Sequence, residues 1–213
     1  MDKDKQKRLQ ASMNAINKKF GADTVTNVAE AVKQGKLDKK IIATPSLELN
    51  DALHCGGLGG IVELYGPNSS GKTSLAMDTI VEEQGKDPDF VAAWLETEAS
   101  ITPDILRDHG IDLSRLIFWQ QEDVGSAESA LDIARGFITA GDVDMLVVNS
   151  IAGLCPKVET QGDLEKQNMA LTARLLSKFF RVANGLASKN KITMVFINQT
   201  RDNIGVMYGK LII

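Results

Sequence analysis

Residues 61–73 read Ile-Val-Glu-Leu-Tyr-Gly-Pro-Asn-Ser-Ser-Gly-Lys-Thr. The first five residues predict an apolar strand, and the residues from 72 to about 83 predict an amphipathic helix. The loop between them has the spacing G-x-x-x-x-G-K-[ST], in which the glycines permit backbone dihedral angles that are closed to other residues. Successive N–H groups of such a loop form an anion nest, and the helix presents its positive end to the same anion. We therefore expect this segment to bind the phosphates of a nucleoside triphosphate.

Individual residues of this phosphate loop have expected roles. Lys72 should reach the β- and γ-phosphates, and Thr73 should place its hydroxyl on Mg²⁺. A chance loop rich in glycine and serine is the alternative, but the flanking strand and helix disfavour it. The expected ATP-binding residues are Gly66, Pro67, Asn68, Ser69, Ser70, Gly71, Lys72, Thr73 and Ser74.

Apolar strands alternate with helices along the rest of the chain. We expect strands at residues 61–65, 90–96, 116–120, 144–149 and 192–199, and helices at residues 72–83, 102–109, 126–139 and 164–187. Residues 46–49 alternate like a strand but could instead begin a short helix over residues 49–53. This order indicates an α/β fold of the P-loop NTPase type, with a mainly parallel sheet flanked by helices. Ligands of such sheets lie at the carboxyl ends of the strands.

The first 35 residues predict a small helical segment that precedes a core at residues 36–213. An amphipathic helix is expected over residues 5–20, and Gly21 would end it. The apolar residues on one face of this helix are Leu9, Met13, Ile16 and Phe20. This stripe either packs on its own domain or docks on a neighbouring subunit, and the periodicity leaves both possibilities open.

Composition limits the classes of function. The chain has 213 residues, 43% of them hydrophobic, and a formal net charge of −4, which excludes a globally basic nucleic-acid binder but not a local basic patch. Cys55 and Cys155 lack a metal-type spacing and are expected to be free thiols. No stretch approaches the ~20 apolar residues that span a bilayer, and the N-terminus has no apolar signal region. We therefore expect a soluble, cytoplasmic protein.

Polar residues end three of the expected strands. The strand before Asn149 ends in an amide, where a nucleotide hydrolase needs an acidic residue for Mg²⁺ or its water ligands. An amide can hold a coordinated water but brings no negative charge, which weakens the case for hydrolysis rather than for binding. Either Glu96 or Glu98 could orient the attacking water, although a solvated strand end is the simpler interpretation of Glu96. Gln199 is either a γ-phosphate sensor or an ordinary polar strand terminus.

Several segments resemble the bacterial RecA recombinase family. They are residues 62–73, 147–154 and 196–209, together with the N-terminal helix that ends in Lys19-Phe20-Gly21 and residues 42–47. The similarity runs from about residue 5 to residue 209. The resemblance implies a RecA-like core and an ATP-dependent recombinase that forms helical filaments on single-stranded DNA. Such a protein would serve homologous recombination, DNA repair and the SOS response to DNA damage.

The resemblance also implies roles for single residues. Glu98 matches the family's catalytic glutamate, Gln199 matches its γ-phosphate sensor, and residues 5–20 match the helix that docks on the adjacent subunit. Residues from about 156 to 168 match the first DNA-binding loop. The candidate contacts to single-stranded DNA are Lys157, Met169, Arg174 and Arg181. Guanidinium groups on phosphates give affinity without sequence choice, but both arginines could instead form salt bridges on a helix surface.

The chain departs from the family pattern at several positions. Asn149 stands where the family has an aspartate. Thr102 and Ile105 stand where an acidic and an aromatic residue flank the nucleotide base, so apolar packing on the base would replace ring stacking. The loop at residues 156–168 is not basic. The family continues beyond the position of Ile213 with a second DNA-binding loop and a C-terminal domain, so we expect a fragment with an uncovered sheet edge.

Three functions therefore compete. The first is a RecA-type recombinase with ATP and Mg²⁺, in which Thr73 and a water on Asn149 face the metal and Glu98, Lys72 and Gln199 are catalytic. The second is a nucleotide-binding protein that joins or caps filaments and does not hydrolyse ATP. The third is another ATPase with the same core, such as a hexameric helicase, against which the N-terminal helix and residues 196–209 argue. Whether the chain hydrolyses ATP stays open.

Overall fold

A computed structural model describes residues 2–160 and 171–200 of the chain. The chain divides into two compact units, Met1–Asp38 and Lys39–Ile213. Within the described residues, no helix is both long and apolar enough to cross a membrane.

The first unit contains helices α1 (Lys3–Phe20) and α2 (Val28–Lys33). The predicted N-terminal helix is confirmed and begins two residues earlier than expected, because the Asp2 side chain accepts the N–H of Asp4 as an N-cap. Gly21, with φ 116°, ends the helix as predicted. The Asn17 side chain holds the segment after this helix against the helix. It accepts the N–H of Val25 at 2.7 Å and donates to the Val25 carbonyl at 2.9 Å. None of the residues of α1 is buried.

The second unit contains a parallel sheet of five strands in the order β3-β7-β6-β4-β5. The strands are β3 (Ile61–Gly66), β4 (Ala92–Glu96), β5 (Leu116–Gln120), β6 (Met145–Asn149) and β7 (Thr193–Gln199). A separate antiparallel pair joins β1 (Ile41–Ile42) to β2 (Leu58–Gly59). The predicted α/β class is therefore confirmed, with all five expected strands in one sheet.

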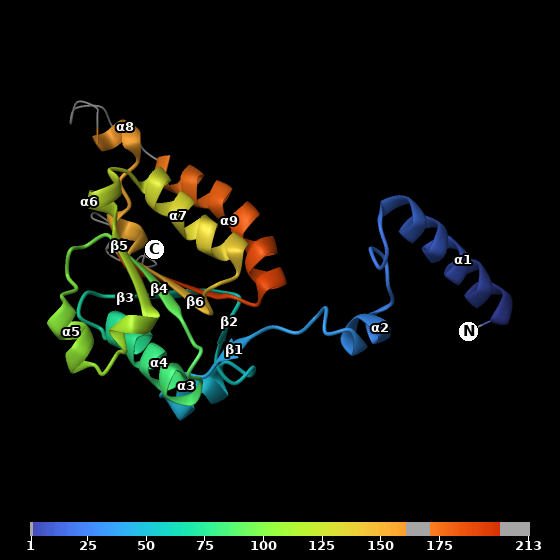
Figure 1. Ribbon diagram of the computed structural model, residues 1–213, viewed down its shortest axis with the longest axis horizontal. Coiled ribbons are helices and arrows are strands. Elements are labelled where there is room, and N and C mark those ends of the chain that lie inside the picture. The colour runs from blue at the N-terminus through green and yellow to red at the C-terminus, as the bar shows by residue number, and fades with distance from the viewer. Residues whose placement is uncertain (1, 161–170, 201–213) are drawn as a thin grey trace, which may run out of the picture. The chain divides into compact units, whose positions relative to one another are not determined.

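Helices cover both faces of this sheet, as Figure 1 shows. The longer helices are α4 (Lys72–Lys86), α7 (Ala127–Ala140) and α9 (Leu171–Asn190). The shorter ones are α3 (Leu47–Ala52), α5 (Pro103–Asp108), α6 (Gln121–Val124) and α8 (Lys157–Thr160), with 3₁₀ turns η1 (Leu113–Arg115) and η2 (Ile151–Gly153). Helices α7 and α9 lie on one face and α4 and α5 on the other, so the strands are buried on both sides.

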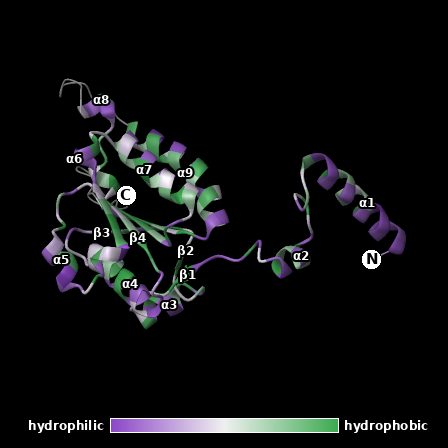
Figure 2. Ribbon diagram, viewed as in Figure 1, coloured by the Kyte–Doolittle hydropathy of each residue, from purple (hydrophilic) through white to green (hydrophobic). Residues whose placement is uncertain are grey.

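Two hydrophobic cores result from the alternation of side chains along each strand. On β7, Met194 and Phe196 face α7 and α9, whereas Val195 and Ile197 face α4. The strands of the sheet are accordingly largely hydrophobic in Figure 2, since both of their faces are covered. The sheet therefore has polar side chains mainly at its strand ends.

Several boundaries differ from the sequence-based expectation. The segment at residues 46–49, which suggested either a strand or a helix, begins α3, because the Ser46 hydroxyl accepts the N–H of Leu49 at 3.2 Å. The second strand begins at Ala92 rather than residue 90, since the N–H of Val91 bonds to the Asp144 carboxylate at 2.9 Å. The last helix extends to Asn190, and the part of its predicted range before Leu171 lies outside the described residues.

Candidate nucleotide-binding site

The phosphate loop joins the end of β3 to the start of α4, at the carboxyl edge of the sheet. Gly71 has φ 86° and Ser69 has φ 59°, so the backbone twice enters the left-handed region. A Cβ atom at Gly66 would lie 3.1 Å from the Ser70 hydroxyl, which shows how tightly the loop turns on itself. Pro67, Asn68, Ser69 and Ser70 are exposed, whereas Thr73 and Ser74 are half-buried in the first turn of α4.

The start of α4 suits an anion. The helix has no side-chain N-cap and no acidic residue in its first turn, so its first N–H groups have no competing carboxylate or hydroxyl partner. At Gly71 an added Cβ would meet no protein atom within 4 Å, and the loop backbone is therefore open to a ligand there. Both observations fit a phosphate group held by backbone N–H groups.

Lys72 folds back over the loop. Its ammonium group donates to the carbonyls of Gly66 at 3.1 Å and Pro67 at 2.7 Å, and it lies 3.4 Å from the Ser70 hydroxyl. These bonds hold the positive charge above the anion nest. Phosphate oxygens could replace the carbonyl partners without any movement of the backbone, because a lysine ammonium turns freely among acceptors.

Glu96 corrects the sequence-based interpretation. It is not a solvated strand end but a fully buried carboxylate, 0% exposed, because β4 lies between β6 and β5 in the sheet. Its Oε1 atom accepts the N–H of Glu98 at 3.0 Å, and the N–H and hydroxyl of Ser100 at 3.3 and 3.2 Å. Its Oε2 atom accepts the indole N–H of Trp94 at 3.0 Å and the Asn149 amide at 2.9 Å.

Asn149 links this carboxylate to the phosphate loop. It is buried at the end of β6, beside Glu96 in the strand register. Its Nδ2 atom donates to Glu96, and its Oδ1 atom lies 3.4 Å from the Thr73 hydroxyl. Within the described part of the chain, no group of three His, Cys, Asp or Glu side chains could hold a metal ion. A Mg²⁺ ion at Thr73 would therefore take most of its ligands from the nucleotide and from water, as Mg²⁺ commonly does.

Glu98 lies just beyond β4 and meets the end of β7. Its Oε1 atom accepts the Gln199 amide at 2.7 Å and also the Ser150 hydroxyl. Gln199 is the strand partner of Gly66, so the same bond brings Glu98 toward the loop. Ser150 was not among the expected site residues, although its place directly after β6 could have suggested it. The structure thus gathers Glu98, Asn149 and Gln199 at one edge of the sheet, beside Thr73.

The two residues expected near the base lie at the start of α5. Thr102 is its N-cap, and its hydroxyl accepts the N–H of Ile105 at 3.3 Å. The Ile105 side chain is partly exposed. The hollow beside the phosphate loop does not include either residue; it is lined by Glu63, Leu64, Tyr65, Ser70, Gly71, Lys72 and Leu75.

The residues expected to contact DNA are spread over α8 and α9. Arg174 and Arg181 are exposed on α9, and no carboxylate within residues 2–160 or 171–200 lies within salt-bridge distance of either. Lys157 begins α8, and its backbone N–H bonds to Glu128 at 2.9 Å. Met169 lies outside the described residues.

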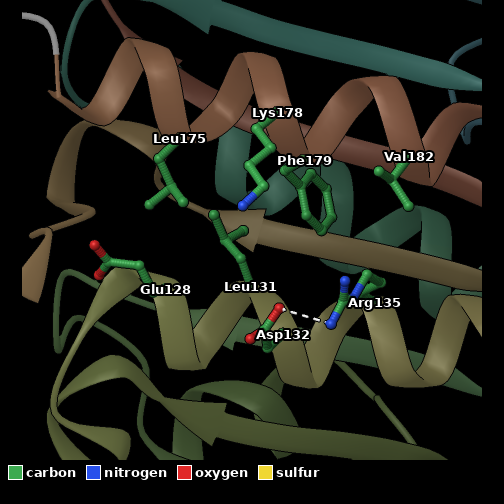
Figure 3. Close-up of a pocket in the computed structure, with 8 residues that line it drawn as sticks. All are labelled: Glu128, Leu131, Asp132, Arg135, Leu175, Lys178, Phe179 and Val182. Carbon is green, nitrogen blue, oxygen red and sulfur yellow. Dashed lines mark ion pairs between the residues drawn. The ribbon is translucent and has the colours of Figure 1, made fainter.

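A second hollow lies between α7 and α9, and Figure 3 shows its lining side chains. Its apolar wall includes Leu131 and Phe179, and its rim carries charges of both signs. Two of these charges pair with each other, since Arg135 lies 3.1 Å from Asp132. The balanced rim gives this hollow no preference for phosphate, in contrast to the loop after β3.

Comparison with known proteins agrees with this architecture. Residues 7–211 match the family model described as the RecA N-terminal domain. The protein RecA of Clostridium acetobutylicum is 38% identical over 211 residues, which cover 98% of this chain and 58% of that protein. Protein RecA of Methylobacterium sp. is 40% identical over 211 residues, with 98% and 56% covered, and that of Mycoplasmopsis pulmonis is 38% identical over 203 residues, with 94% and 58% covered.

This chain therefore spans somewhat more than half the length of these relatives. The family model covers nearly all of the chain and includes the phosphate loop and every strand of the parallel sheet. Because the match extends over the whole ATP-binding fold rather than one motif, the chain belongs to the RecA family.

Proposed function

We propose that this chain binds ATP with Mg²⁺ at residues 66–73 and uses the nucleotide to control binding to single-stranded DNA in homologous recombination and repair. The observation that carries the proposal is the meeting of Glu98, Gln199 and Asn149 beside Thr73. A simple phosphate-binding protein needs only the loop. Polar groups from three further strand ends are what a site needs to sense or cleave a γ-phosphate.

The loop residues bind the triphosphate. N–H groups of the loop and of the first turn of α4 hold the phosphate oxygens, and Lys72 exchanges its carbonyl partners for them. A bound Mg²⁺ ion would neutralise charge on the phosphates. Thr73 would supply a hydroxyl ligand for it, and the Asn149 amide oxygen would hold a water ligand.

Glu98 and Gln199 respond to the γ-phosphate. The Gln199 amide donates to Glu98 at 2.7 Å, so a phosphate oxygen near Gln199 competes for the same donor. When Gln199 turns to the phosphate, Glu98 loses one hydrogen bond and becomes able to orient a water for attack. Gln199 ends β7, and the change would pass to the residues that follow it.

DNA binding and self-association complete the proposal and rest on family membership. The exposed guanidinium groups of Arg174 and Arg181 on α9 suit the sugar–phosphate backbone of single-stranded DNA. Residues 5–20 form a helix without buried residues, and its apolar stripe suits docking on a second copy of the chain in a filament.

A second candidate function is nucleotide binding without hydrolysis, in a protein that joins or caps filaments. The observation that favours it is the neutral amide of Asn149 beside Thr73. An acidic side chain at that point would hold the metal and its waters more strongly than an amide does.

Nucleotide binding by the purified chain tests the first step. A fluorescent ATP analogue should bind to the original chain, and Lys72→Ala should abolish binding because it removes the only side-chain charge of the loop. Tight binding by Lys72→Ala would refute the loop assignment. Lys86→Ala removes a positive charge at the far end of the same helix, where Lys86 pairs with Glu82 and Glu83, and serves as a control with retained binding.

Turnover separates the two candidates. Phosphate release is measured for the original chain and for Glu98→Gln, each with and without single-stranded DNA. Release that DNA stimulates and that Glu98→Gln removes supports the recombinase proposal. Binding without release in either condition supports the non-hydrolysing candidate.

A further inference from the structure

The proposed mechanism gives no role to Glu96, although this residue is the most deeply buried carboxylate near the loop. It is 0% exposed and accepts five hydrogen bonds, from Trp94, Asn149, Glu98 and, twice, Ser100. Four of the five bonds come from N–H groups, which only donate, and the fifth comes from the Ser100 hydroxyl, which can donate or accept. None of the basic side chains in the described ranges forms a salt bridge with it.

The two oxygens of Glu96 serve two different parts of the site. Oε1 holds the backbone of Glu98 and the N–H and hydroxyl of Ser100, which shape the turn that carries the Glu98 side chain. Oε2 holds the amide of Asn149, which belongs to the neighbouring strand. One buried carboxylate therefore fixes both of the groups that face the γ-phosphate and the metal in the proposed function.

Glu96 also determines which end of the Asn149 amide faces Thr73. With Nδ2 on Glu96, the Oδ1 atom points to the Thr73 hydroxyl, at 3.4 Å. In the flipped orientation, the amide oxygen would face the Glu96 oxygen, and two acceptors would lie in contact without a proton between them. That arrangement leaves a buried carboxylate oxygen and a buried amide unsatisfied, which is strongly unfavourable.

We propose that Glu96 and Asn149 form one functional unit, in which Glu96 is a positioning residue that keeps the Asn149 amide oxygen directed at the metal side of Thr73. In this unit the negative charge lies on Glu96. Glu96 does not face Thr73 itself but holds the Asn149 amide, whose oxygen does. The proposal rests on the proposed ATP and Mg²⁺ binding at the loop. It assigns the acidic function of the site to a strand neighbour of Asn149 rather than to position 149.

A specific consequence follows for Asn149→Asp. That substitution alone would place a second carboxylate against Oε2 of Glu96, where the amide donor now lies at 2.9 Å. Two buried carboxylates at such a distance repel each other, so the variant should weaken the site rather than improve it. Glu96→Gln combined with Asn149→Asp exchanges the two groups, because a glutamine amide in the place of Oε2 can donate to the new aspartate and the unit keeps one negative charge. The exchange is incomplete, since the Trp94 indole N–H, which now bonds to Oε2 at 3.0 Å, loses its acceptor.

The first measurement is the dependence of nucleotide affinity on Mg²⁺. The dissociation constant of a fluorescent ATP analogue is determined with Mg²⁺ and with EDTA. The Mg²⁺ ratio, defined as the constant in EDTA divided by the constant in Mg²⁺, is then compared among variants. We expect Glu96→Gln and Asn149→Asp each to reduce this ratio about tenfold, as for the loss of one hydrogen bond to a charged group, and the double variant to restore part of it. Thr79→Val, which removes the buried hydroxyl bond to the Leu75 carbonyl in α4, should change stability without changing the ratio.

The second measurement needs no nucleotide. The melting temperatures of the four proteins form a double-mutant cycle, and Asn149→Asp should melt below both the original chain and the double variant. The comparison of Asn149→Asp with the double variant does not depend on whether Glu96→Gln folds alone. A double variant that is no more stable than Asn149→Asp, or an Asn149→Asp variant with an increased Mg²⁺ ratio, would overturn the proposal.

The two proposals fail in different ways. If the original chain binds no ATP, the proposed function fails. The positioning proposal then fails with it, even if the double-mutant cycle shows that Glu96 and Asn149 interact. If the original chain binds ATP with a clear Mg²⁺ dependence that the variants leave unchanged, the positioning role of Glu96 is refuted and the proposed function stands.

Discussion

Replacing Gly71 by alanine tests two properties of the phosphate loop separately. One is the contribution of its left-handed backbone to folding stability, and the other is the binding of a phosphate by its N–H groups. Gly71 has φ 86°, and an added Cβ would meet no protein atom within 4 Å. The substitution therefore creates no clash, and its cost in folding stability is that of a left-handed backbone, about 1–2 kcal/mol. For a chain of this length, that corresponds to a decrease in melting temperature of roughly 2–8 °C.

The space that the new methyl group enters is the space that the phosphates are expected to fill. We therefore expect Gly71→Ala to lose ATP binding by far more than its change in stability would explain, because a methyl group displaces a phosphate oxygen from the N–H groups. Gly125 is a matched control: it ends α6 with φ 78°, and an added Cβ there also meets nothing within 4 Å.

Both variants are examined by thermal melting and by titration with a fluorescent ATP analogue. Gly125→Ala should have about the same melting temperature as Gly71→Ala but should bind the nucleotide as tightly as the original chain. Equal nucleotide binding by Gly71→Ala and Gly125→Ala would refute the assignment of this backbone to the phosphates. Equal melting of Gly71→Ala and the original chain would refute the conformational argument.

Three further predictions concern stability and reactivity. Gly136→Ala, in the interior of α7 with open space at the new Cβ, should raise the unfolding free energy in urea by about 1 kcal/mol, and no gain would contradict the helical assignment. Phe196→Ala should lower it by about 3–5 kcal/mol, because the ring is 1% exposed and stacks edge-on against Phe180 at 4.8 Å; a loss below about 1 kcal/mol would show that this core is not packed as described. Burial, with Glu159 and Glu128 nearby, raises the pKa of the Cys155 thiol, so less thiolate is present at pH 8. Iodoacetamide should therefore modify Cys155 more slowly than the exposed Cys55, as followed by mass spectrometry, and the Cys155 rate should still increase above pH 9; equal rates would contradict the burial.

Much of the fold was predictable because local patterns determine it. The strand before the phosphate loop, the loop itself and α4 follow from apolar periodicity and glycine spacing. The N-terminal helix and its end at Gly21 were also predicted correctly, since an amphipathic repeat and a C-terminal glycine are local signals. The short segment at residues 46–49 was ambiguous because four residues fit a strand and a helix equally well, and only the Ser46 cap decides between them.

The environment of Glu96 illustrates what the sequence did not reveal. In the sequence it is one of two acidic residues after an apolar strand, and nothing local distinguishes a solvated carboxylate from a buried one. It is buried because β4 lies between β5 and β6, and the order of strands in a sheet depends on how distant segments pack. Its partner Asn149 lies 53 positions away along the chain and meets it through the strand register alone.

The sequence by itself determined the phosphate loop, the class of fold and the residue types at the strand ends, because backbone propensity and hydrophobic periodicity act over a few residues. Only the tertiary structure decided which of those strand ends meet: Gln199 with Glu98, and Asn149 with both Glu96 and Thr73. The physical reason is that a side-chain hydrogen bond requires its atoms to lie within about 3 Å. Parallel strands satisfy that requirement only through the order and register that the packed cores on both faces of the sheet impose.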